Sequence, residues 1–251
     1  MTTLTLLVKT KHGAHIRAIA ESLKDQFEEL DVEAEVLNNT ANRWVQVSVS
    51  GEDEAIATSY LRKTYGLCPV TLENAKVTDT FKAYISKVDE TKQQLIIDVG
   101  IFEPQIVPAI ISVDCLQTQI AEGKSLSMRK IAELFGLAEG IPLNVKVNWE
   151  KSAEGELSAE LSPEQAAKFL SWRQSMLDRL IVLGTSLETV NSAIERTKLI
   201  RDIIDVETLG AFEFALTCKL GTDAAGLIPR MGRYMRYSVF VVFRGEKAWT
   251  L

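Results

Sequence analysis

The sequence has few of the residues that hold metals or form disulfides. Among 251 residues there are three cysteines and two histidines. Cys68, Cys115 and Cys218 lie far apart and form no CxxC pair, which argues against a zinc site and favours free thiols in a reducing compartment. We therefore expect no bound metal and no cofactor.

Long apolar runs and leader-like features are also missing. No run approaches the roughly 18 apolar residues that suggest a membrane-spanning helix. The first residues, MTTLTLLVKTKHG, place no basic region ahead of their apolar residues and contain no small-residue cleavage site, so we expect no signal peptide. Six prolines and fourteen glycines are too few for a fibrous or disordered chain. These absences predict a folded cytoplasmic protein with no membrane partner.

Acidic residues exceed basic ones, and the excess is uneven. The net charge is -6, and residues 1–72 carry 7 basic and 10 acidic side chains. Residues 73–162 carry 9 basic and 14 acidic side chains, whereas residues 163–251 carry 12 basic and 10 acidic ones. A broad nucleic-acid-binding surface on the first two thirds is therefore disfavoured, and only the last third has a basic surplus.

The middle of the chain, residues 74–162, has the pattern of a small β-barrel. Short apolar or alternating runs bounded by turn residues predict five strands, at residues 76–87, 95–99, 106–111, 141–149 and 156–161. A helical insertion is expected at residues 125–137, plugging one end. This arrangement favours an OB-type barrel, with four side chains facing its interior: Val145, Val147, Leu157 and Leu161.

Residues 1–73 predict an α+β unit with the order β-α-β-β-α-β. Apolar residues at helical spacing mark a helix over 13–30, and alternating residues mark the strands at 32–36 and 45–49. A second helix is expected from Glu52, with a last short strand at 70–72. This order is that of a ferredoxin-like unit.

Residues 163–251 predict a C-terminal α+β domain. Ser162 and Gln165 have capping-box spacing, and Pro163 stands at the first helical position. Thr185 and Glu188 predict a second capping box. Strands are expected at 180–183, at 211–219 as a half-buried strand, and at 239–243 as a central strand buried on both faces.

One loop near the N-terminus is a candidate anion site. Lys11, His12 and His15 lie between the first predicted strand and helix, where free backbone N–H groups can hold a phosphate. The alternative is an ordinary solvated loop, because no P-loop pattern is present. No serine lies in a GxSxG elbow, so we assign no catalytic residue.

Residues 221–237 contain several arginines and tyrosines. Three glycines and a proline in the same stretch predict an irregular backbone. No acidic residue occurs between Ala224 and Gly245. Arginines hold phosphates and tyrosines stack on bases, so this composition suits single-stranded RNA. The candidate residues are Arg230, Arg233, Tyr234, Arg236, Tyr237 and Arg244. In the alternative, these arginines pair with Asp202, Asp205 and Glu207 of the same domain.

Two stretches resemble known proteins. GIPLNVKVNWEKSAEGELSAELS, residues 140–162, and LIIDVG, residues 95–100, resemble strands of the RNA-binding OB domains of ribosomal proteins. Together with RDIIDVETLGAFEFALTCKLGTDAAGLIPRMG, residues 201–232, they make the chain similar to an archaea-restricted, uncharacterised family, the domain of unknown function number twenty-one ten. The resemblance implies an archaeal cytoplasmic protein and supplies no activity.

These patterns lead us to expect a non-catalytic protein that binds single-stranded or ribosomal RNA, or that associates with the ribosome. The alternative is a protein-interaction scaffold whose OB barrel docks a protein partner. A third and weaker alternative is a phosphate-handling enzyme that uses the loop at His12.

Overall fold

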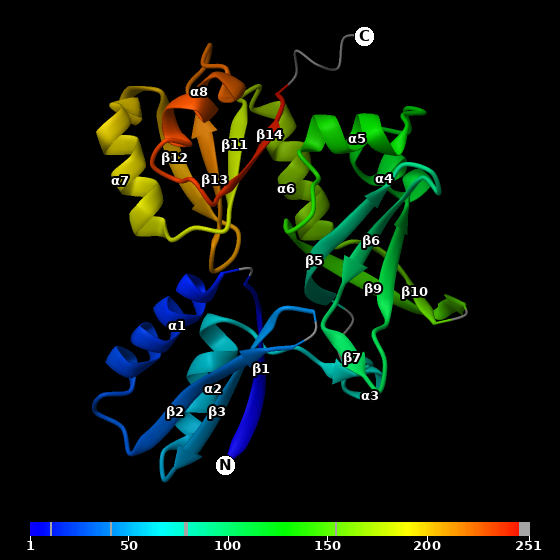
Figure 1. Ribbon diagram of the computed structural model, residues 1–251. Helices are drawn as coiled ribbons and strands as arrows, with labels where there is room; N and C mark the ends of the chain where they lie inside the picture. Colours follow the sequence, from blue (N-terminus) through cyan, green and yellow to red (C-terminus); the bar gives the residue numbers. More distant parts are fainter. Residues whose placement is uncertain (11, 41, 78–79, 154, 246–251) are drawn as a thin grey trace. The chain divides into compact units, whose positions relative to one another are not determined.

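The chain forms two compact units (Figure 1). The computed structural model describes residues 1–10, 12–40, 42–77, 80–153 and 155–245. The first unit comprises Met1–Val77 and Gly100–Ile106, and the second comprises Thr78–Val99 and Val107–Leu251. The barrel and the C-terminal sheet therefore belong to the same unit. No helix among the described residues is long and apolar enough to cross a membrane.

The first unit is built on a three-stranded antiparallel sheet in the order β1-β3-β2. Its elements are β1 (Thr2–Lys9), α1 (Gly13–Gln26), β2 (Val32–Asn39), β3 (Trp44–Gly51) and α2 (Glu54–Thr64). Leu6 and Val47 of the strands and Leu23 and Leu61 of the helices are fully buried. The apolar periodicity thus predicted these elements correctly, although α1 ends earlier than the predicted residue 30.

The strand predicted at residues 70–72 exists in part but does not join this sheet. β4 (Val70–Thr71) pairs in parallel with β7 (Ile101–Glu103), and α3 (Leu72–Ala75) follows it. The segment just before Pro69 lies beside β1 instead, because the Cys68 N–H donates to the Thr5 carbonyl at 2.8 Å. Proline has no N–H to donate to a strand ladder, which is why the pairing beside β1 stops at this position.

Five strands of the second unit close into a barrel. In cyclic order they are β10 (Glu156–Leu161), β8 (Pro108–Ser112), β6 (Gln94–Asp98), β5 (Thr80–Asp89) and β9 (Pro142–Ala153). The β8–β10 pair is parallel and the other pairs are antiparallel. The four side chains predicted to face the interior are at most 4% exposed, which confirms the alternation behind the prediction.

Two helices, rather than the one predicted, lie between β8 and β9. These are α4 (Val113–Ile120) and α5 (Met128–Phe135), and each begins at a serine that accepts a backbone N–H bond. Ser112 accepts from the Cys115 N–H, and Ser127 accepts from the Lys130 N–H. The prediction missed α4 because Ser112, its N-cap residue, is also the last residue of β8. The apolar residues of the helix therefore follow those of the strand without a visible break.

The C-terminal sheet has four antiparallel strands in the order β12-β13-β11-β14. After α6 (Pro163–Gln174), the chain forms β11 (Arg179–Leu183), α7 (Leu187–Thr197), the 3-10 turn η1 (Leu199–Arg201), β12 (Ile203–Thr208), β13 (Glu213–Cys218), α8 (Ala224–Met231) and β14 (Val239–Phe243). The succession strand, helix, strand, strand, helix, strand also occurs in the first unit, where the segment beside β1 takes the last position.

Three predictions for this domain were wrong. β14 is an edge strand with Val239 50% exposed, and its buried end is covered by α5, where the Arg244 N–H donates to the Leu134 carbonyl. β13, predicted to be half-buried, is buried at every position because it lies inside the sheet. The cap of α7 is Ser186, which accepts the Thr189 N–H, and not Thr185.

The two faces of this sheet are covered differently (Figure 1). α7 and α8 cover one face over an aliphatic core that includes Val182, Leu216 and Leu227. On the other face, Phe243 packs edge-to-face against Trp172 of α6 and Phe135 of α5, with ring centroids 5.3 and 5.9 Å away. The barrel and the C-terminal sheet therefore share one continuous core.

The start of α6 is fixed to the barrel by Ser162, which is fully buried. Its hydroxyl accepts the Gln165 N–H at 3.1 Å, and its own N–H donates to the Asn144 carbonyl at 2.9 Å. Gln165 does not complete the predicted capping box, because its Oε1 accepts the Asn144 N–H at 3.1 Å. Two hydrogen bonds thus join the cap to β9, and a third lies within the cap.

We predict that Ser162→Ala lowers the free energy of unfolding by about 1 kcal/mol, since it leaves a buried helix-terminal N–H without its acceptor. Urea unfolding followed by circular dichroism measures this. The matched control is Ser171→Ala, which changes an exposed residue of the same helix. Equal unfolding midpoints for the two variants would contradict the role of the cap.

Candidate functional site

The arginine–tyrosine run is more ordered than predicted. Its first part is the helix α8, capped by Asp223, whose side chain accepts the Ala225 N–H at 3.1 Å. Two tight turns follow, closed by bonds from the Tyr234 N–H to the Met231 carbonyl and from the Ser238 N–H to the Met235 carbonyl. The prediction of irregular backbone over 221–237 was therefore wrong for the helical part.

Arg230 is engaged within the domain. Its Nη2 donates to the Thr197 carbonyl at 2.6 Å, and its Nη1 lies 3.8 Å from Asp202 Oδ2. Thr197 is the last residue of α7, so this guanidinium caps the negative end of the helix. Of the acids named as alternative partners, Glu207 pairs with Lys168 at 2.5 Å.

The next four candidate residues, Arg233, Tyr234, Arg236 and Tyr237, are exposed, whereas Met235 among them is buried. Tyr234 is 46% exposed and Tyr237 is 80% exposed. Exposure of two aromatic rings between arginines is the arrangement that base stacking requires.

The fold adds two cations that the sequence reasoning missed. The Arg196 guanidinium lies 5.8 Å from the centre of the Tyr234 ring, and both Arg196 and Lys198 are exposed at the end of α7. A signal was available, because segments 196–201 and 224–245 together contain seven basic and no acidic residues. We call the resulting group the arginine–tyrosine surface; it consists of Arg196, Lys198, Arg233, Tyr234, Arg236 and Tyr237.

Arg244 lies apart from this surface. It is exposed and follows the last residue of β14, whereas Arg236 precedes the first residue of that strand. A strand rises about 3.3 Å per residue, so β14 is about 13 Å long from its first residue to its last. The Arg244 N–H donates to the Leu134 carbonyl of α5, at the end of β14 that is farther along the chain from Arg236. The structure therefore brings together only part of the predicted group.

The loop near the N-terminus contains the other predicted residues. His12 is the N-cap residue of α1 and its side chain makes no capping bond. Its ring contacts that of His15 edge-to-face, with centroids 5.7 Å apart. Lys11 lies outside the described residues. Over the described part of the chain, no cluster of three His, Cys, Asp or Glu side chains could hold a metal.

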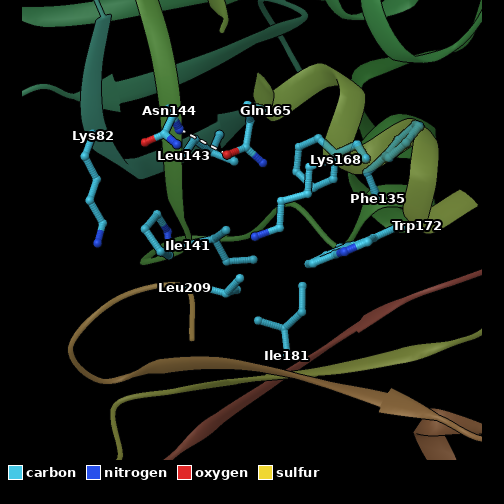
Figure 2. Close-up of a pocket in the computed structure, with 13 residues that line it drawn as sticks. Lys82, Phe135, Ile141, Leu143, Asn144, Gln165, Lys168, Trp172, Ile181 and Leu209 are labelled. Carbon is cyan, nitrogen blue, oxygen red and sulfur yellow. Dashed lines mark hydrogen bonds between the residues drawn. The ribbon is translucent and has the colours of Figure 1, made fainter. Parts of the chain in front are cut away.

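A cavity of about 50 Å³ lies between the barrel and the C-terminal sheet (Figure 2). Ile141, Ile181 and Leu209 contribute apolar walls, and Trp172 forms one side. Four polar residues line it: Lys82 of β5, Asn144 of β9, and Gln165 and Lys168 of α6. Sequence reasoning missed this group, since its members are spread over three elements and none forms a motif.

A buried acid, Glu213, lies beside this cavity. Its Oε2 accepts bonds from the Tyr84 hydroxyl and the Phe212 N–H, both at 3.3 Å. Burial raises the pKa of Glu213 to about 7. Gly210 leaves room for this carboxylate, because a Cβ there would lie 2.0 Å from Oε2 and Glu213 would have to move. Burial also lowers the pKa of Lys82, although the field of Glu213 opposes this shift.

Comparison with known families accounts for most of the chain. Models of the DUF2110 N-terminal, central and C-terminal domains match residues 4–70, 75–173 and 177–243. Among curated proteins, no match to the chain was found. The central match includes the barrel and α6, so it contains all four polar residues of the cavity. The C-terminal match contains Arg230 of α8 and all six residues of the arginine–tyrosine surface.

We predict that the stability of the second unit falls as the pH rises from about 4.5 to about 7. Folded Glu213 holds its proton up to about pH 7, whereas the unfolded chain releases it near its ordinary value, so the folded state binds more protons in this window. The stabilisation is complete below about pH 4.5 and is lost through about pH 7. The loss is about 3 kcal/mol at most.

Glu213→Gln keeps an acceptor for the Tyr84 hydroxyl and removes the titration. Urea unfolding at several pH values should show the variant equal to the wild type near pH 4.5 and more stable at pH 8. Glu156→Gln changes an exposed carboxylate of β10 and serves as the control. A wild-type pH slope that persists in Glu213→Gln would disprove the assignment.

Proposed function

The chain belongs to the DUF2110 family, and we propose that it is a non-catalytic RNA-binding protein that holds single-stranded RNA on its arginine–tyrosine surface. The observation that carries the proposal is the meeting of two segments distant in sequence. The end of α7 brings Arg196 over the ring of Tyr234, next to the exposed Arg233, Arg236 and Tyr237.

The chemistry of these side chains supports an unpaired nucleic acid. Guanidinium groups form paired hydrogen bonds to phosphate oxygens, and exposed tyrosines offer a flat apolar face to a base. In a duplex the bases are already stacked on each other, and the deep major groove of RNA does not admit side chains. A single strand can present its backbone to the arginines and its bases to Tyr237.

We also propose a fold type for the barrel and for the first unit. We propose an OB-type barrel, supported by the cyclic order in which the third barrel strand pairs with the fifth in parallel, and by the helices between the third and fourth. We propose a ferredoxin-like first unit, supported by its element order and by the segment that lies beside β1. An archaeal source and a cytoplasmic location remain expectations from the resemblance.

We predict that RNA binding weakens steeply as the salt concentration rises. The four cations of the surface should release counterions on binding, which gives a slope of log affinity against log salt of roughly -3 for a single strand. Raising salt from about 50 to about 200 mM should then weaken binding about fifty-fold. Fluorescence anisotropy with a labelled oligouridine measures the slope.

Substitutions separate charge from stacking. Arg233→Gln should make the slope less steep by about 0.7, while Arg244→Gln, the matched control away from the surface, should leave it unchanged. Tyr237→Ala should cost roughly 1–3 kcal/mol of binding free energy with the slope unchanged, because stacking is not ionic. No binding at low salt, or equal effects of Arg233→Gln and Arg244→Gln, would refute the proposal and leave the protein-scaffold alternative ahead.

A further inference from the structure

Lys82 is a partly buried cation on which the buried Glu213 acts only through its field. It lines the cavity described above, and burial lowers its pKa. In the described part of the chain, no carboxylate lies within ion-pair distance of its ammonium group, whereas Lys168 pairs with Glu207 and Lys87 with Asp89. An unpaired charge removed from water is costly unless something compensates it.

Besides Lys82, the cavity is lined by the donor Lys168 and by two side-chain amides, Asn144 and Gln165, each with a donor and an acceptor atom. A lysine ammonium carries three donors and no acceptor. The Oε1 of Gln165 is occupied by the Asn144 N–H, so the group that Gln165 leaves free is its amide nitrogen. Figure 2 shows this nitrogen turned to the side on which Lys168 lies. A ligand that complements Lys82, Lys168 and Gln165 must therefore be an acceptor.

The size of the cavity restricts the ligand. Its volume of about 50 Å³ exceeds the roughly 10–15 Å³ that one water molecule needs and is far below the roughly 300–1,000 Å³ of a drug-sized pocket. Its apolar walls lower the local dielectric constant, which strengthens the attraction between a lysine and an anion. These properties suit a small, highly charged oxyanion.

We propose that this cavity binds a small oxyanion of the phosphate class between Lys82, Lys168 and the amide nitrogen of Gln165. Lysines bind phosphate as point charges, and the anion would place a negative charge in direct contact with Lys82, which no carboxylate of the described residues does. Since the cavity is lined by barrel strands, α6 and the C-terminal sheet, the bound anion would stabilise the packing of the sheet on the barrel. This site is separate from the arginine–tyrosine surface and does not depend on RNA binding.

The test is thermal unfolding of the full chain in inorganic phosphate, with sodium chloride at matched ionic strength as the reference. A ligand that binds only the folded state raises the melting temperature with a saturating dependence on its concentration. ³¹P NMR line broadening measures the same binding directly. The variants are Lys82→Met and, as the matched control, Lys87→Met, which removes an exposed lysine of the same strand.

We expect the wild type and Lys87→Met to show saturable binding, and Lys82→Met to bind phosphate at least tenfold more weakly. In phosphate-free buffer Lys82→Met should melt at a higher temperature than the wild type, because it removes an uncompensated charge. Gln165→Glu, which keeps an acceptor for the Asn144 N–H and places a negative oxygen in the site, should abolish binding.

Two results would overturn the proposal. One is a rise in melting temperature that never saturates and is the same in Lys82→Met, which is the general effect of excluded salts. The other is a lower melting temperature of Lys82→Met without phosphate, which would show that Lys82 is compensated within the protein by Glu213. RNA binding should be unchanged in Lys82→Met, so failure of this site is distinguishable from failure of the proposed function.

Discussion

The packing of Phe243 and Trp172 between the barrel and the C-terminal sheet is the contact on which the second unit depends. Phe135 and Phe169 extend it, with ring centroids 5.6 Å apart, and Arg179 lies over the Trp172 ring at 4.8 Å. Edge-to-face contacts of this kind add to the stabilisation that burial provides. The cluster also decides what remains available for binding. Because it covers one face of the C-terminal sheet while α7 and α8 cover the other, this sheet has no open face on which bases could stack, which leaves its helix ends and loops as its exposed surface.

The same interface contains two cations in contrasting states. Arg179 is buried, and its Nη1 donates to the Trp172 and Leu177 carbonyls and to the Ser175 hydroxyl at 3.1 to 3.2 Å. Its charge is thus solvated by protein oxygens in place of water. Lys82 has no such set of acceptors, although burial lowers its pKa as burial lowers that of Arg179. Three acceptors of the fold surround Nη1 of Arg179, whereas our proposal assigns the corresponding role at Lys82 to a bound anion.

Local patterns could be predicted from the sequence, and pairings between distant segments could not. The alternation of Val145 and Val147 is a property of one strand, and this prediction was confirmed. The Ser162 cap is a property of neighbouring residues and was also confirmed, but Gln165 does not complete the predicted capping box because it binds the distant Asn144. The edge position of β14 was missed because an apolar run suggests burial between neighbouring strands. In the structure the helix α5 covers the buried end of this strand instead. Lys82 occupies an ordinary outward position in an alternating strand, and only the docking of the C-terminal sheet over it makes it unusual. Arg196 was missed because its partner Tyr234 is far along the chain.

The arginine–tyrosine surface lies at the C-terminal ends of α7 and α8, so its positive charge could simply neutralise the helix dipoles. The C-terminus of a helix carries roughly half a negative charge, so the ends of α7 and α8 together need about one cation. Arg230 meets that need at α7, where it binds the Thr197 carbonyl and also approaches Asp202. Arg196, Lys198, Arg233 and Arg236 remain, which is several charges more than the helix ends and Asp202 can neutralise. A surplus of this size at an exposed site costs self-repulsion in the free protein. The proposed RNA binding accounts for this surplus, because approaching phosphates would relieve it and Tyr237, 80% exposed, would offer a base a stacking face.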